Sequence, residues 1–143
     1  MTPKLKNVLI FFQLVVGLGW ALGVTWLFLA IAASAEPISR VTVVAYWGAV
    51  LVGPVVLVVG SLSLVAPTRH RQFASLLAVV GSLAVSIQSL VWVAPSVGAS
   101  LGRNQTGLAA LAASIVAISV LSSLGAFVLY RDERAAGPPA RPA

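Results

Sequence analysis

The sequence predicts an all-α membrane protein, an antiparallel bundle of four transmembrane helices. Four apolar stretches, at about 8–33, 41–66, 73–94 and 107–130, contain no Asp, Glu, Lys, Arg or His. Each is longer than the roughly 20 residues that a helix needs to cross the hydrocarbon core of a bilayer. The chain is 59% hydrophobic and only 8% charged, whereas soluble domains carry about 25% charged residues. Because the connections are short, consecutive helices should lie side by side in opposite directions.

The apolar stretches occupy most of the chain, so we expect residues 1–134 to form a single membrane domain. Residues 135–143 are rich in Pro, Ala and Gly, which predicts a disordered cytoplasmic tail. The start of the chain also has features of a secretory signal, with an A-x-A pattern at Ala33 to Ala35. The apolar core of a signal is typically about 7–15 residues long. We therefore expect the first helix to be retained; cleavage would leave a chain beginning at Glu36.

The first stretch carries Gly19 and Gly23, a GxxxG spacing. Small residues at this spacing let another helix backbone approach closely in a bilayer, where there is no hydrophobic drive between helices. The partner helix can belong to a second copy or to the same subunit. We expect contact within the subunit, since glycine is common in membrane helices.

The second stretch contains Gly53 and Pro54 at its centre. Proline lacks a backbone N–H group and clashes with the preceding turn, so these residues predict a kink. Broken helices line binding sites in some transporters. Isolated kinks are also common in membrane helices, and no polar residue accompanies this break in the sequence, so we interpret it as structural.

The third stretch is the most polar. Ser75, Ser82, Ser86 and Ser89 fall within about 60° of one another at 100° per residue, whereas Gln88 lies on another face with small residues. Small residues on two faces predict that this is the central packing helix. The serine hydroxyls are expected mainly to bond carbonyls of their own helix.

Gln13 and Gln88, together with Ser82 and Ser86, are the candidate intramembrane polar contacts. An unpaired buried amide is costly. At 1.5 Å per residue, Gln13 and Gln88 differ in membrane depth by roughly 18 Å, so they should not bond one another. Each needs another partner, such as Thr25 or Trp20, a backbone carbonyl, water or a ligand.

The fourth stretch ends at Tyr130, and basic residues follow it. Seven of the nine Lys and Arg residues fall on one side of a four-pass topology, and Arg40 and Arg103 fall on the other. The seven are Lys4, Lys6, Arg69, Arg71, Arg131, Arg134 and Arg141. Basic residues concentrate on the cytoplasmic side. We therefore expect a protein of the cell membrane with both termini in the cytoplasm.

No catalytic residue, cofactor-binding residue or metal-ligand set can be identified. The carboxylate side chains, Glu36, Asp132 and Glu133, are divided between opposite sides of the membrane, and there is no cysteine. An enzyme needs acids, bases or nucleophiles within mutual reach, and a proton-coupled transporter normally needs an ionisable intramembrane group. Small four-helix multidrug exporters are similar in length and helix number, but their membrane-embedded glutamate has no counterpart here. We expect no enzyme and no cofactor.

The expected role is therefore that of an accessory, scaffolding or regulatory protein. It would contact the lipid bilayer and, through helix faces, a membrane-protein partner or further copies of itself. The alternatives are an oligomeric passive pore or neutral-solute carrier, and a phage-type membrane-permeabilising protein. Nucleic acid is not expected as a partner, because the basic residues flank apolar spans. The composition, rich in Ala, Val, Leu and Arg, is typical of a GC-rich bacterial genome.

The topology can be tested with single cysteines at Ser39, Ser100 and Thr68, because the chain has no cysteine of its own. An impermeant thiol reagent added to intact cells should label the first two sites and spare the third. Labelling at Thr68 alone would overturn the orientation.

Overall fold

The computed structural model describes residues 1–33, 39–65 and 70–136. Every regular element within these residues is helical. The elements are α1 (Pro3–Ala33), α2 (Arg40–Val50), the π-helix η1 (Leu51–Val55), α3 (Val56–Val65), α4 (Arg71–Trp92), α5 (Ala94–Gly102) and α6 (Thr106–Ala135).

Four helical stretches in the described part of the chain are long and apolar enough to cross a membrane. They are Pro3–Ala30, Arg40–Val65, Arg71–Gly102 and Thr106–Ala135. The second combines α2, η1 and α3, and the third combines α4 and α5. These four stretches correspond to the four apolar stretches of the sequence.

The helices extend beyond the charge-free stretches. Helix α1 begins at Pro3 and includes Lys4 and Lys6, whereas the sequence predicted a start near residue 8. Helix α6 continues to Ala135, the first residue assigned to the tail; residues 137–143 lie outside the described residues. Charged side chains at a helix end can reach the interface of a bilayer, so they do not stop the helix.

The predicted connection at 95–106 is wrong in one respect, because most of it is the helix α5. Helix α4 does end before Pro95, and a turn at Val93 separates it from α5. Proline is tolerated in the first turn of a helix, where its missing N–H group would have no intrahelical partner. The chain therefore bends at Val93 and resumes a helix. Asn104, with φ of 56°, then adopts the left-handed conformation in the turn before α6.

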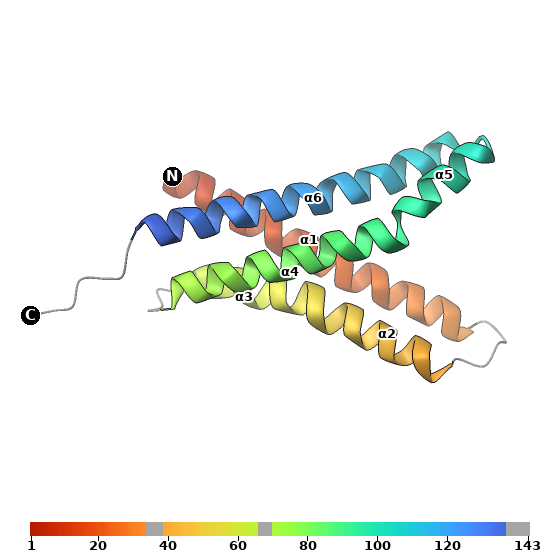
Figure 1. Ribbon diagram of the computed structural model, residues 1–143, viewed down its shortest axis with the longest axis horizontal. Coiled ribbons are helices and arrows are strands. Elements are labelled where there is room, and N and C mark those ends of the chain that lie inside the picture. The colour runs from red at the N-terminus through yellow and green to blue at the C-terminus, as the bar shows by residue number, and fades with distance from the viewer. Residues whose placement is uncertain (34–38, 66–69, 137–143) are drawn as a thin grey trace, which may run out of the picture.

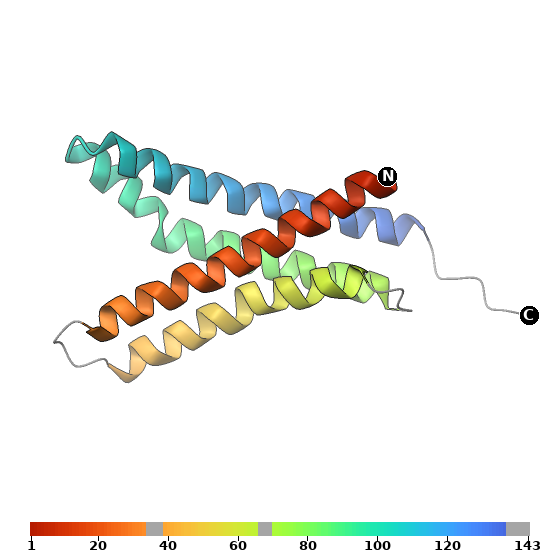
Figure 2. The same cartoon turned by 180° about the vertical axis from the view of Figure 1, so that it is seen from behind.

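Figures 1 and 2 show where the ends of the helices lie. The N-terminus, the end of α3, the start of α4 and the end of α6 share one end of the molecule, which we call the inner end. The end of α1, the start of α2 and the turn between α5 and α6 share the other, outer end. Toward the outer end the α1–α2 pair and the α5–α6 pair diverge in both views.

Helix α4 is the central packing helix, as predicted. Its contacts with α6 and with α3 are the two most extensive between elements, and it also touches α1, η1 and α5. The contact with α3 is made through glycines. A Cβ added at Gly81 would lie 2.3 Å from the backbone nitrogen of Leu57, and one at Gly60 would lie 2.5 Å from that of Ala78. Glycine therefore allows the two backbones to approach closely.

The interruption predicted at Gly53 and Pro54 is a turn of π-helix. Both residues are buried within η1, which joins α2 to α3. Proline cannot donate the i→i−4 hydrogen bond, and a wider turn is one way for a helix to accommodate this loss. The helix therefore changes its hydrogen-bonding pattern at this point without ending.

Gly19 and Gly23 do not pack against the described part of the chain. A Cβ added at either position meets nothing within 4 Å, whereas one at Gly17 would lie 2.8 Å from Val58 Cγ2. Two residues rotate a helical position by about 200°, so Gly19 faces away from the side on which Gly17 is buried. The expected contact of the GxxxG pair within the subunit is thus wrong, and Gly17 makes the close contact.

Two ion pairs join the start of α1 to the end of α6 at the inner end. The Met1 amino group lies 3.0 Å from Asp132 Oδ1, and Lys6 Nζ contacts Glu133 Oε1. Glu133 is buried, with only 6% of its surface exposed. The first and last helices are thereby connected by ion pairs that the sequence analysis did not predict.

The glycine contact predicts a position-dependent effect of alanine. Gly81→Ala and Gly60→Ala should each destabilise the protein by about 1–3 kcal/mol, because the added methyl group meets backbone atoms. Gly19→Ala is the matched control, since its methyl group enters open space. Thermal unfolding in detergent would measure the difference; equal melting temperatures for all three variants would contradict this packing.

Candidate functional site

Gln88 lies where α1, η1 and α4 meet. Trp20 Nε1 of α1 donates a hydrogen bond of 2.7 Å to Gln88 Oε1. A Cβ added at Gly53 would lie 3.2 Å from both amide atoms of Gln88, so this amide packs directly against the π-helix. Glycine at 53 leaves room for it. The structure thus places Gln88 against Gly53 of the helix break, and its hydrogen-bond partner is Trp20, one of the side chains expected as a partner for the glutamines.

This junction changes the interpretation of the helix break. The sequence interpretation treated the break as structural because no polar residue lay near it along the chain. The polar partner comes from α4, which is distant in sequence and adjacent in space. The junction, defined by Trp20, Gly53, Pro54 and Gln88, is therefore a polar site inside an apolar helix assembly.

A second polar contact joins α1 to α6. Gln13 is fully buried. Its Nε2 donates to the carbonyl oxygen of Ser122 at 2.6 Å, and its Oε1 accepts a 2.7 Å hydrogen bond from Ser122 Oγ. Gln13 and Gln88 thus have separate partners on different helices.

The predicted serine stripe of α4 divides into two groups. Ser75 and Ser82 donate to carbonyl oxygens three residues back in their own helix, at 2.8 and 2.9 Å. Ser86 instead donates to the Ser119 carbonyl oxygen of α6 at 2.7 Å. Its Oγ also lies 2.7 Å from Ser123 Oγ. The expectation of bonding within the helix therefore describes only part of the stripe.

Ser89 has both kinds of partner, because it donates to the Ser86 carbonyl oxygen and lies 2.5 Å from Ser119 Oγ. The α6 serines were not singled out in the sequence. Ser119, Ser122 and Ser123 follow a helical spacing of three and four residues, which could have marked them as one face. They form the interface with α4 and α1.

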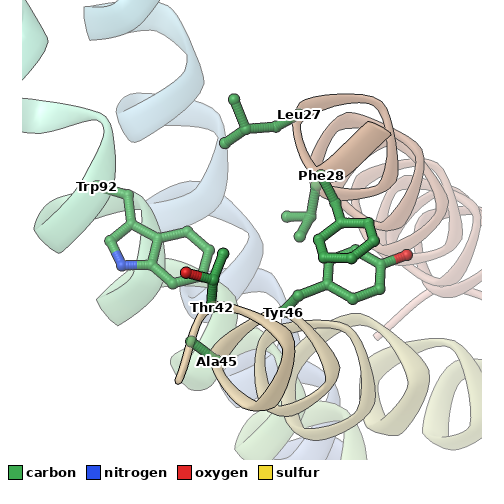
Figure 3. A pocket seen from close by; sticks show the side chains of 7 residues that line it. Leu27, Phe28, Thr42, Ala45, Tyr46 and Trp92 are labelled. Atoms are coloured by element: carbon green, nitrogen blue, oxygen red, sulfur yellow. The ribbon is translucent and has the colours of Figure 1, made fainter. Parts of the chain in front are cut away.

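An apolar cavity of about 200 Å³ lies beyond the junction, toward the outer end. Its walls come from α1, α2 and α4, and its lining residues are Val24, Leu27, Phe28, Thr42, Ala45, Tyr46 and Trp92. Figure 3 shows Trp92 on one side and the rings of Phe28 and Tyr46 on the other. These two rings stack with centroids 4.2 Å apart, and Thr25 Oγ1 lies 3.1 Å from the Tyr46 hydroxyl.

The cavity and the junction are neighbours along the helices. Trp92 lies one helical turn beyond Gln88 on α4, and Val24 lies one turn beyond Trp20 on α1. The lining carries no ionisable group other than the Tyr46 phenol. The cavity can accommodate an apolar or aromatic group. Within the described residues, no group of three His, Asp or Glu side chains could hold a metal ion.

No family model, curated protein or solved structure matches this chain.

The Trp20–Gln88 bond can be measured with a double-mutant cycle. Gln88→Leu alone leaves the Trp20 N–H group without its acceptor, so it should destabilise the protein by about 1–2 kcal/mol. Trp20→Phe combined with Gln88→Leu should cost less than the sum of the single changes. The measurement is unfolding in mixed micelles. Additivity within about 0.3 kcal/mol would mean that the two residues are not coupled.

Proposed function

We propose that the four helical stretches form an antiparallel bundle inserted in the cell membrane, with the inner end in the cytoplasm. Three features support this proposal. Each stretch is long and apolar enough to span a membrane. Both described ends of the chain lie at the inner end, and most of the basic residues fall at that end. Concentration of Lys and Arg on the cytoplasmic side then gives the orientation.

Within the membrane, the protein acts as an accessory, scaffolding or regulatory partner through helix–helix contacts. The observation that carries this proposal is how the buried polar groups are used. Gln13, Ser86 and Ser89 bond α1 and α4 to α6, and Gln88 bonds α4 to α1. A pore or carrier needs polar groups directed at its solute, whereas these groups hold the helices together.

The external face of α1 provides the surface for such contacts. A Cβ added at Gly19 or Gly23 would meet no other atom within 4 Å. Leu22, which lies between the two glycines, is 70% exposed, and Trp26, which follows them, is 71% exposed. In a bilayer, a glycine pair beside large apolar side chains can receive another helix at close range. The partner is a second copy of this chain or another membrane protein.

The neutral-solute carrier is the second candidate, and the outer cavity is the observation that favours it. Its apolar lining suits a hydrophobic solute. The Trp20–Gln88 hydrogen bond lies about one helical turn inward of this cavity, so a solute that moved inward between α1 and α4 would have to pass it. The accessory role needs no such movement and is the function that we favour.

Cross-linking tests the contact surface. Gly19→Cys or Gly23→Cys should give a cross-linked product in native membranes with a short bifunctional maleimide. Leu121→Cys is the matched control, because Leu121 is also exposed but lies on a different helix, α6. Products from Leu121→Cys alone, or equally from all three variants, would contradict the proposed surface.

Reconstitution into proteoliposomes distinguishes the accessory role from the carrier role. Purified protein in proteoliposomes should give no saturable solute uptake, with or without an imposed pH gradient. Saturable uptake by the protein alone would replace the accessory role with the carrier role.

A further inference from the structure

A second cavity, of about 330 Å³, lies at the inner end between the start of α4 and the end of α6. It is distinct from the aromatic cavity and is lined by Gln72, Phe73, Leu76, Tyr130 and Arg134. Phe73 and Leu76 are 60% and 43% exposed, so their apolar surfaces are available to a ligand. The cavity combines this apolar wall with an amide, a phenol and a guanidinium group.

Polarity changes with depth along both walls. Gln72 lies in the first turn of α4, and Leu76 lies one turn deeper. Arg134 lies in the last turn of α6, and Tyr130 lies one turn deeper. In the proposed bilayer, the charged group is at the interface and the apolar groups are toward the hydrocarbon core. A glycerophospholipid has the same order of polarity, because its phosphate lies at the interface and its acyl chains extend into the hydrocarbon core.

The positive charge at this cavity, on the Arg134 guanidinium group, is available to bind an anionic ligand. The acidic residues next to Arg134 on α6 are already engaged, since Asp132 pairs with the Met1 amino group and Glu133 pairs with Lys6. Arg134 forms no ion pair within the described residues. Arg71 and Arg131, which adjoin Gln72 and Tyr130 in sequence, add positive charge at the same end.

We propose that this cavity binds one anionic glycerophospholipid of the inner leaflet. The Arg134 guanidinium holds the phosphate, for which its planar donor geometry is suited. Gln72 and Tyr130 offer hydrogen bonds to the polar headgroup and ester region, and an acyl chain lies over Phe73 and Leu76. The assignment of the leaflet rests on the membrane orientation proposed above, whereas binding itself does not depend on the accessory role.

The test uses full-length protein in detergent with phosphatidylglycerol or phosphatidylcholine of identical acyl chains, followed by native mass spectrometry. The protein should retain phosphatidylglycerol preferentially. Arg134→Gln should weaken that retention about five-fold, the contribution typical of one basic residue near a membrane surface. Arg103→Gln, which removes an exposed arginine at the outer end, is the matched control and should retain the lipid as the unmodified protein does.

Two further variants and one competitor complete the test. Leu76→Trp should fill the apolar half and reduce retention without changing the charge, and a normal size-exclusion profile would show that the variant is folded. Glycerol phosphate, which has the headgroup and no acyl chain, should not displace the lipid. Equal retention of both lipids, equal losses from Arg134→Gln and Arg103→Gln, or full displacement by glycerol phosphate would overturn the proposal. Solute uptake by proteoliposomes would instead contradict the accessory role and leave this site standing.

Discussion

The backbone of the central helix α4 rests against that of α3 at Gly81 and Gly60, and the close approach of these two helices depends on the absence of a side chain at both positions. A Cβ at either glycine would overlap backbone atoms of the opposite helix. Because lipid tails are as apolar as the side chains, helices in a bilayer gain little from simple burial, and close backbone packing must hold them. Helix α3 packs on one face of α4, and a different face directs Ser86 and Ser89 at α6.

The sequence was sufficient to predict the four helical stretches and the central packing helix. Long charge-free stretches leave a chain few alternatives to helix in a bilayer, and the serines and small residues of 73–94 marked α4 as central. The partners could not be predicted in the same way. When a helix is apolar all round, its periodicity does not distinguish a buried face from a lipid-facing one. The GxxxG spacing therefore pointed to Gly19 and Gly23, although Gly17 makes the close contact.

The site was predictable in part for a related reason. Gln88 and Pro54 are conspicuous in sequence because an amide and an imino acid are unusual in an apolar helix. The contact of Gln88 with Gly53, the residue before Pro54, joins helices that are distant in sequence, so it depends on how α4 is rotated against η1. The helix α5 was missed because the third predicted helix ended at residue 94, directly before Pro95, whereas proline also suits the first turn of a new helix.

The contacts between the first and last helices have a consequence for biosynthesis. Gln13 and Ser122 are separated by 109 residues, and Lys6 and Glu133 by 127. In the proposed membrane, α1 enters the bilayer before the segment that satisfies Gln13 has been made. Its amide must meanwhile bond water, lipid headgroups or the insertion machinery, since an unsatisfied amide in hydrocarbon is costly. The bundle is therefore completed only when α6 arrives, and synthesis that stops before α6 leaves Gln13 without Ser122.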